Sequence, residues 1–388
     1  MPIYFDYNAG APLRPEARAA LELFLEREAG NPASVHRAGQ RARRMLERAR
    51  EAMAELIGAA PATVVFTSGG TEANNLAILG SARARPERRR VVSSAIEHSS
   101  ILAPLAWLEA SGYEVIRLAP DREGRVVPEA VAASLDDKTC LLSLGLANSE
   151  VGTLQEAGAL ASLARCTGAS FHLDAVQAVG RVGVDVAALG CDLLTISGHK
   201  LGAPAGTGAL YVRAGTPISP TMLGGPQEGA MRAGTPNLCG AVALGAVAEA
   251  LSRGWREESE RVERLTSRLL EGLRARIFGL RLNGPEAGRV PGTLNLTFPL
   301  VAGESLLIAL DLAGVEVSMG SACAAGAVEP SHVLLAMGLS PAAAQSSLRL
   351  SLGWQTTAEE VDRAVATIAR LWRQVSRVEG TAAQEAEP

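Results

Sequence analysis

Short apolar runs alternate with amphipathic stretches along most of the chain. Runs rich in β-branched and aliphatic residues predict strands at 64–67, 91–93, 114–118, 141–146, 170–173, 193–196 and 209–212. Apolar residues at helical spacing predict helices at 15–28, 34–57, 99–110, 128–134 and 154–167, with a further helical segment at 76–79. This alternation predicts an α/β fold, a mainly parallel seven-stranded sheet sandwiched by helices.

The pattern changes in the last third of the chain. A Gly/Pro-rich loop at 215–236 is followed by two predicted helices, 237–252 and 257–277. Beyond them we expect a smaller α+β unit with strands at 292–296, 315–317 and 347–352 and helices at 304–312, 331–337 and 357–375.

These patterns predict two domains. We expect a large domain at 15–255, and a small domain formed by 1–14 together with 256–376 that carries a mobile cysteine loop. Residues 377–388 are expected to form a flexible tail, frayed from 380 onward.

Composition narrows the class of protein. Among 388 residues, 47% are hydrophobic and 20% charged, which predicts a soluble chain with a sizeable core. The net charge is −4, and the basic runs at 41–50 and 83–90 are expected to be solvent-exposed surface segments. No nucleic-acid partner is therefore expected. No apolar stretch reaches the roughly 18 residues of a membrane span, and the first residues do not resemble a signal peptide. We therefore expect a cytoplasmic protein without membrane contact.

Cysteine usage argues against structural metal or disulfide chemistry. The five cysteines stand at 140, 166, 191, 239 and 323, without CxxC or CxxH spacing. We expect most of them to be small buried hydrophobes and expect no metal.

Lysine usage singles out one position. Lysine occurs only at Lys138 and Lys200, while arginine supplies the rest of the positive charge. Arginine cannot lose its proton or form an imine, whereas a desolvated lysine can do both. Lys200 follows a short apolar run and precedes a glycine-rich loop. Taken alone it also fits a solvated surface lysine, so the case depends on its neighbours.

Polar groups follow several of the predicted strands. Ligands of open α/β sheets bind at the carboxyl ends of strands. The polar residues at these predicted ends are Glu97, His98, 148–150, Asp174, Gln177, Ser197, His199 and Lys200.

The segment 68–75 combines a glycine turn with a helix start. Free backbone N–H groups at a helix N-terminus suit a phosphate, although the segment is not a Walker loop. A lysine paired with a carboxylate, here Lys200 and Asp174, is what pyridoxal phosphate requires of a protein. Gly70, Thr71, Ser197 and His199 would then hold the phosphate, and His98 could lie flat on the ring. Taken singly, either histidine also fits a hydrogen-bonded structural role.

Several segments resemble one enzyme family. They are FTSGGTEANNLAI (66–78), EHSS (97–100), NSEVGTLQ (148–155), HLDAVQAVG (172–180), SGHKLGAPAGTGALYV (197–212), MRAGT (231–235), GSACAAGAVEPSHVLLAMG (320–338) and SSLRLSLGWQTTAEE (346–360). In this order they resemble the cysteine desulfurases, which are aminotransferase class V, fold-type I pyridoxal phosphate enzymes. The resemblance runs from Tyr4 to about Arg373.

The resemblance implies a role for each matching residue. Lys200 binds the cofactor as an imine and moves protons, Asp174 pairs with the pyridine nitrogen, Gln177 bonds the phenolic oxygen, and His98 stacks on the ring. Asn148 and Arg349 hold the substrate carboxylate, the arginine as a bidentate clamp. The residues implied for the phosphate are Gly70, Thr71, Ser197, His199 and Thr235, the last from the second subunit of a homodimer.

Cys323 decides the specific activity that the resemblance implies. It lies in a run of small residues suited to a loop that can move, although a lone cysteine is more often buried core. In the family, such a cysteine attacks the sulfur of L-cysteine, which releases L-alanine and leaves a persulfide. A sulfur-acceptor protein, such as an iron–sulfur scaffold, or a thiolation pathway then receives the sulfur.

The chain also departs from the family pattern. Gly229 stands where the family has arginine, the segment 202–205 lacks the usual lysine, and 9–12 replaces Ala-Thr-Thr-Pro. Two other functions therefore stay open: a selenocysteine lyase or another class V lyase, and a catalytically degenerate sulfur-transfer scaffold. Comparing cysteine, selenocysteine and cystine as substrates would test the first alternative. Alanine production by the isolated protein would exclude the second.

Overall fold

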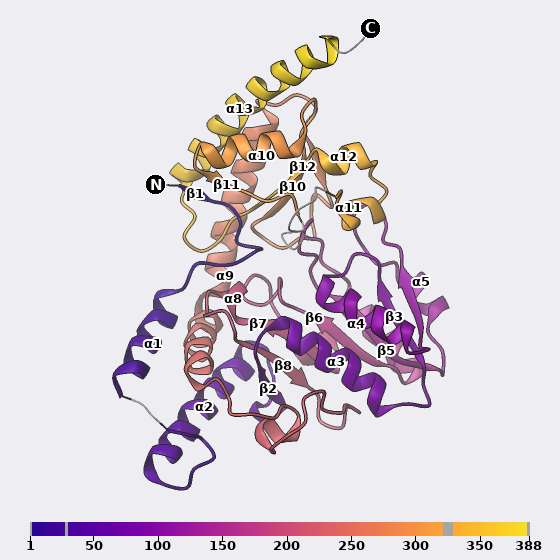
Figure 1. Cartoon of the computed structure of the whole chain (residues 1–388), viewed down its shortest axis with the longest axis vertical. Helices are drawn as coiled ribbons and strands as arrows, with labels where there is room; N and C mark the ends of the chain where they lie inside the picture. The colour runs from indigo at the N-terminus through magenta and orange to yellow at the C-terminus, as the bar shows by residue number, and fades with distance from the viewer. Residues whose placement is uncertain (1, 28–29, 321–328, 386–388) are drawn as a thin grey trace.

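The structure is a computed structural model that describes residues 2–27, 30–320 and 329–385. Figure 1 shows two bodies stacked along the long axis, with helix α9 (Leu238–Arg274) running from one into the other. The N-terminal strand β1 (Ile3–Tyr4) lies in the upper body, and α1 (Pro15–Arg27) lies beside the lower one. The chain therefore begins in the smaller body and crosses to the larger.

The larger body is built on a seven-stranded sheet, as predicted. Its order is β2 (Val64–Thr67), β8 (Gly208–Val212), β7 (Leu193–Ser197), β6 (Ser170–Asp174), β5 (Thr139–Gly145), β3 (Arg90–Ser94) and β4 (Glu114–Leu118). Only β8 runs antiparallel to its neighbours. The carboxyl ends of the other six strands therefore share one edge.

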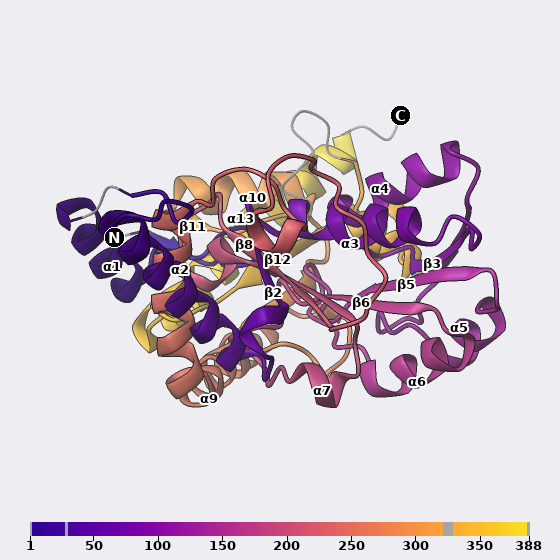
Figure 2. The same cartoon turned by 90° about the horizontal axis from the view of Figure 1, so that it is seen from below.

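Helices cover both faces of this sheet. Figure 2 shows α3 (Gly70–Ala84) and α4 (Ser99–Ala110) on one side, and α5 (Pro128–Ser134), α6 (Ala157–Thr167) and α7 (Val186–Leu189) on the other. On the first face, Leu76 and Leu105 pack against strand side chains such as Leu141. On the second, α2 (Arg37–Leu56) and α9 join α6 over the sheet. Burial of both strand faces explains the near-continuous apolar runs in the sequence.

The smaller body has its own core. Its antiparallel sheet has the order β12 (Ser347–Ser351), β10 (Thr293–Thr297) and β9 (Arg281–Asn283), and β1 pairs in parallel with β11 (Val315–Glu316). Helices α10 (Gly303–Leu312) and α13 (Ala358–Glu385) pack over it with the second half of α9. Phe5 and Phe298 are fully buried there, so the N-terminal strand is an integral part of this core.

Two predicted helices are one. The sequence predicts a break between 252 and 257, but α9 continues through Gly254. A single glycine in a helix costs only about 1 kcal/mol, and apolar faces on both sides of it are buried in the two cores. The burial outweighs that cost.

Short elements and boundaries differ from the prediction as well. Helix α3 begins at Gly70 rather than near 76. Seven of the described elements have no predicted counterpart: β1, β9, α7, α8 (Gly198–Leu201), α12 (Pro341–Gln345), η1 (Pro61–Thr63) and η2 (Gln227–Ala230). Helix α11 (His332–Ala336) lies close to its predicted range. Helix α13 continues to Glu385, and the flexible tail expected at 377–388 stays a prediction.

Two features are absent from the described residues. No helix among them is long and apolar enough to cross a membrane. Nor do these residues include a group of three or more His, Cys, Asp or Glu side chains placed to hold a metal ion.

Candidate active site

A cavity of about 380 Å³ opens at the carboxyl edge of the large sheet, and Arg349 from β12 closes it on the side of the small body. It gathers nearly every described residue that the sequence singles out: Gly70, Thr71, His98, Asn148, Asp174, Gln177, Ser197, His199, Lys200 and Arg349. Thr235 is exposed in the loop after η2 and does not line this cavity. Cys323 lies outside the described residues. The cavity is therefore the candidate active site.

Lys200 enters the cavity from the short helix α8, directly after β7. Its Nζ donates to the backbone carbonyls of Asn8 at 2.6 Å and Ala9 at 2.7 Å. Gly202 caps the C-terminal end of α8, and its φ of +89° is left-handed. A Cβ at Gly202 would lie 2.7 Å from Arg14 Cγ, so only glycine fits here. The tight turn holds the lysine at the strand end.

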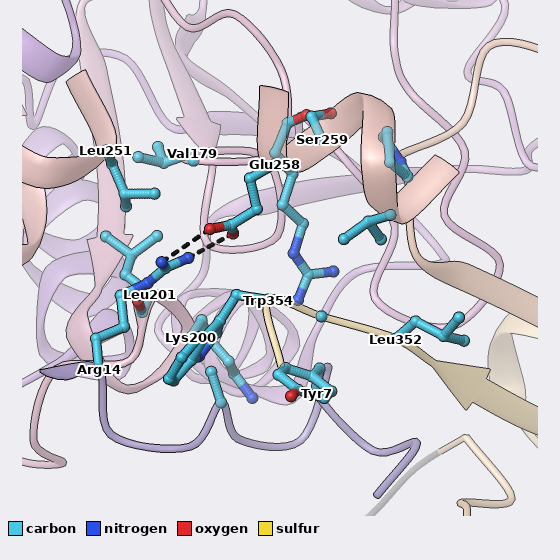
Figure 3. A pocket seen from close by; sticks show the side chains of 16 residues that line it. Tyr7, Arg14, Val179, Lys200, Leu201, Leu251, Glu258, Ser259, Leu352 and Trp354 are labelled. Carbon is cyan, nitrogen blue, oxygen red and sulfur yellow. Dashed lines mark hydrogen bonds and ion pairs between the residues drawn. The ribbon is translucent and has the colours of Figure 1, made fainter. Parts of the chain in front are cut away.

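A second, smaller cavity of about 30 Å³ lies beside Lys200 (Figure 3). Arg14 crosses its wall and makes two hydrogen bonds to Glu258 of α9, at 2.9 and 2.5 Å. Arg14 Nε also donates to the Leu201 carbonyl at 2.8 Å, and its guanidinium lies 5.2 Å from the Trp354 ring centroid. Arg14 thus ties the residue after Lys200 to the long helix.

Asp174 ends β6 on the cavity floor and is buried. Its Oδ2 accepts a hydrogen bond from Asn74 Nδ2 at 2.8 Å, and its Oδ1 accepts one from the Val176 N–H at 2.9 Å. Burial raises the pKa of Asp174, while the Asn74 hydrogen bond is the largest influence in the opposite direction. The positive charge of Lys200 also lowers the pKa of Asp174, which places the two groups within electrostatic reach. A cationic ring nitrogen at this carboxyl would stabilise its ionised form.

Two histidines, His98 and His199, flank the cavity, and the pKa of each is lowered. Partial withdrawal of the His98 ring from water lowers its pKa, and the nearby Lys200 contributes. Burial lowers the pKa of His199 to about 4, and its Nδ1 lies 2.9 Å from Ser197 Oγ. His98 is exposed toward the cavity in this chain, so one ring face is open to a flat group.

The start of α3 forms a cradle beside β7. Gly69, the N-cap residue, supplies no side-chain hydrogen bond to the first-turn N–H groups. A Cβ on Gly70 would lie 3.0 Å from Val176 Cγ2 and 3.3 Å from Ser197 Cβ. With Thr71 and Ser197 at the same wall, this helix start fits a phosphate. The carboxyl of Asp174 and this cradle together fit a phosphorylated pyridine.

Asn148 and Gln177 line the same cavity through amide groups. Asn148 Nδ2 donates to the Ile96 carbonyl at 3.0 Å, and its Oδ1 accepts the N–H groups of Glu150 and Val151. Gln177 Nε2 donates to the Asn8 carbonyl at 3.0 Å. Its Oε1 is buried and has no hydrogen-bond partner among the described residues. That oxygen is an acceptor suited to a bound molecule.

Arg349 reaches the cavity from the middle of β12 and is 3% exposed. Its Nη2 donates to Asp6 Oδ1 at 2.8 Å, and its Nη1 donates to the carbonyls of Gly320 at 3.0 Å and Ser149 at 3.2 Å. Its Nε is buried and has no partner among the residues that the structure describes. A substrate carboxylate at this edge would satisfy it.

Three further cavity residues, Asn8, Asn74 and His332, were not singled out from the sequence, and Glu97 and Glu150 were noted there only as polar groups after strands. Asn74, Glu97, Glu150 and His332 stand inside the motifs on which the resemblance depends, so their position was a usable signal. Asn8 lies in the N-terminal turn, 192 residues before the lysine that contacts its carbonyl. No local pattern marks such a contact.

The chain is similar to known proteins over most of its length. The family model for aminotransferase class-V matches residues 3–364. A cysteine desulfurase IscS from Dictyoglomus turgidum is 42% identical over 370 residues, covering 95% of this chain and 94% of the relative. A solved NifS-like protein superposes with a TM-score of 0.90 at 32% identity, over 96% of this chain and all of its own. SspA, solved in complex with cysteine, has a TM-score of 0.82 at 31% identity, over 91% of this chain and 99% of its own.

The chain therefore belongs to the aminotransferase class-V family, and within it to the cysteine desulfurases. This confirms the family, the fold class and the activity that the sequence predicts. Members of this family depend on pyridoxal phosphate. Cysteine desulfurases act on L-cysteine and pass its sulfur to acceptor proteins.

Proposed function

We propose that the cavity beside Lys200 binds pyridoxal phosphate and L-cysteine, and that the substrate's sulfur is transferred to Cys323. One S–C bond breaks in the substrate, and one S–S bond forms at Cys323. The products are L-alanine and a persulfide on the protein. The observation that carries the proposal is the gathering of a lysine, a buried carboxylate, an anion cradle and a buried arginine around one cavity.

The cofactor would be held from several sides. Lys200 would bind it covalently, Asp174 would face its ring nitrogen, and His98 would cover one face of the ring. Gly70, Thr71, Ser197 and His199 would surround the phosphate, and Gln177 would contact the ring oxygen. When bound, the protonated ring supplies an electron sink for the bonds of an attached amino acid.

The substrate would be oriented by its carboxylate. Arg349 offers the unpaired Nε together with Nη2, two N–H groups on one edge of the guanidinium. A carboxylate can accept both in a bidentate pair. Asn148 lies in the same cavity wall, and its second amide N–H can add a further hydrogen bond. The carboxylate would thus point the Cβ–S bond in one direction.

Proton transfer would fall to Lys200. Its Nζ lies within hydrogen-bond distance of two backbone carbonyl oxygens, which can accept the protons of an ammonium group. A lysine released from the cofactor can therefore hold a proton there and return it to the substrate carbon.

The remaining assignments concern partners and place. We propose a homodimer in which Thr235 of one copy completes the phosphate site of the other, supported by its exposure in its own chain. A sulfur-acceptor protein, such as an iron–sulfur scaffold, would remove the persulfide sulfur, and the enzyme would act in the cytoplasm. The proposed domain division at about residue 255 follows the passage of α9 from one core to the other.

The proposal is tested by product analysis. The purified protein, loaded with pyridoxal phosphate, is incubated with L-cysteine, L-cystine or L-selenocysteine, and alanine is quantified. Preferential release of alanine from L-cysteine supports the proposal. Preference for selenocysteine would favour the lyase, and partner binding without alanine would favour the degenerate scaffold.

A further inference from the structure

His98 is the N-cap residue of α4 and is held by its own helix. Its Nδ1 accepts a hydrogen bond from the backbone N–H of Ser100 at 3.1 Å. The same nitrogen lies 2.8 Å from the Ser100 hydroxyl oxygen. A backbone N–H can only donate, so Nδ1 must present its lone pair to it.

A second residue determines where the Ser100 hydroxyl proton points. Asn74 Nδ2 donates both to Ser100 Oγ and to Asp174 Oδ2, each at 2.8 Å. The amide must face the carboxylate with its N–H₂ group, because two oxygens would repel each other. Ser100 Oγ therefore accepts one hydrogen bond and retains its own proton, which it can donate to His98 Nδ1.

We propose that Ser100 and Asn74 are positioning residues that hold His98 as a neutral imidazole with its proton on Nε2. His98 then faces the bound substrate and cofactor as a hydrogen-bond donor and not as a base. This inference rests on the proposed function, because it assigns a role within the same site.

The donor role follows from simple proton accounting. A neutral imidazole carries one proton, and with Nδ1 engaged as an acceptor this proton must lie on Nε2. Nε2 then has no lone pair with which to remove a proton from the substrate. Protonating Nδ1 would set its new N–H against the Ser100 N–H. Proton uptake in the cavity is thereby left to Lys200.

The surrounding charges favour the same state. His98 faces Asp174 of β6, Lys200 of α8 and His332 of α11, and the neighbouring His199 is also within electrostatic reach. Lys200 and His332 oppose a positive charge on His98, while Asp174 favours one. Asn74 engages the Asp174 oxygen that would otherwise be available to an imidazolium.

The test is the tautomeric state of His98, measured by ¹H–¹⁵N NMR of the full-length holoenzyme labelled in histidine ring nitrogens. The His98 signals are identified by their loss in His98→Gln. We expect a protonated Nε2 and an unprotonated Nδ1, unchanged from about pH 6 to about pH 9. A protonated Nδ1, or a titration midpoint within that range, would overturn the inference even if every variant folds.

Ser100→Ala tests the positioning role directly. It removes the hydroxyl but keeps the backbone N–H, so one of two hydrogen bonds to the neutral ring is lost. We expect the protonation midpoint of His98 to rise by about half to one pH unit. Ser111→Ala, at the far end of α4 where the hydroxyl bonds the Trp107 carbonyl, is the matched control and should leave the midpoint unchanged. An equal midpoint in Ser100→Ala and the unchanged protein would contradict the role of Ser100.

These outcomes are separate from the test of the proposed function. An active desulfurase with a protonated His98 Nδ1 overturns this inference alone. An inactive protein with the Nε2 tautomer overturns the proposed function alone.

Discussion

Lys200 Nζ donates to the backbone carbonyl of Asn8 at 2.6 Å, across 192 residues of sequence. The Asn8 side chain in turn bonds both bodies of the molecule: its Nδ2 donates to Thr293 Oγ1 at 3.0 Å, and its Oδ1 accepts from Arg181 Nη1 at 2.6 Å. The N-terminal segment therefore connects Lys200 to the sheet of the smaller body, and it belongs to the candidate active site as much as the strand ends do.

Replacing Asn8 should weaken both the fold and the site. Asn8→Ala leaves the partly buried Arg181 guanidinium and the buried Thr293 hydroxyl without these bonds, which should lower the free energy of unfolding by about 2–4 kcal/mol. Urea denaturation measures this, and kcat should fall because the segment that holds Lys200 loosens. Asn31→Ala, in an exposed loop, serves as the control and should cost no more than about 1 kcal/mol. Equal losses in both variants would show that Asn8 has no special structural role.

The chain offers a matched pair of lysine substitutions. Lys200→Arg keeps a positive charge but cannot form an imine, so the visible absorbance of the bound cofactor should be altered and alanine production should fall by more than about 10³-fold. Lys138→Arg makes the same change at the only other lysine, which is exposed, and should retain full activity. Substantial activity in Lys200→Arg would mean that another group carries the cofactor.

The sheet was predictable because its strands are buried on both faces and bounded by turns. The runs at 141–146 and 193–196 are short and mostly aliphatic, and the segments that link the predicted strands have apolar residues at helical spacing. A window of a few residues therefore contains the whole pattern that predicts each strand. Asp174 and Lys200 were predictable as a pair for the same reason, since both follow such runs. Asp174 and Lys200 each mark the carboxyl end of a strand, and the parallel arrangement brings these ends to the same edge of the sheet.

The sequence-based predictions failed where contacts between residues far apart in the sequence determine the structure. Gly254 looks like a helix break, but α9 is continuous because separate cores bury its two halves. Asn74 lies in a motif that the sequence singles out, yet its bond to Asp174 joins residues 100 positions apart. Neither relationship produces a periodic pattern that a sequence window can contain.

The arginine clamp can be tested with a truncated substrate. Arg349→Lys replaces a planar fork by a single ammonium group, so kcat/KM for L-cysteine should fall by about 10²-fold, mainly through KM. Cysteamine lacks the carboxylate, and its turnover should be nearly unaffected by the same change. A parallel loss for both compounds would indicate structural damage, since Arg349 also bonds Gly320 and Asp6.

Glu97 should make stability depend on pH. Burial raises its pKa from 4.5 to about 7, while Ser94 Oγ and the Gly145 N–H bond its two oxygens. The folded chain thus holds this proton to higher pH than the unfolded chain does. The resulting stability is present in full below about pH 4.5 and is lost as pH rises through about 7, by at most about 3 kcal/mol.

Glu97→Gln mimics the protonated acid and should remove this dependence. Its thermal unfolding midpoint should fall less between about pH 5 and about pH 8 than that of the unchanged protein. At the higher pH the variant should be the more stable of the two. Parallel pH profiles would mean that Glu97 is ionised in the folded chain throughout this range.

The most direct test of the account follows the sulfur atom itself. The holoenzyme is treated with L-cysteine, digested without reductant and analysed by peptide mass spectrometry, with and without later addition of a thiol. The account predicts the mass of one added sulfur on the peptide that contains Cys323, removable by thiol, and no addition at residues 140, 166, 191 or 239. Full alanine production with the sulfur on another cysteine, or undiminished sulfur transfer by Cys323→Ser, would contradict it.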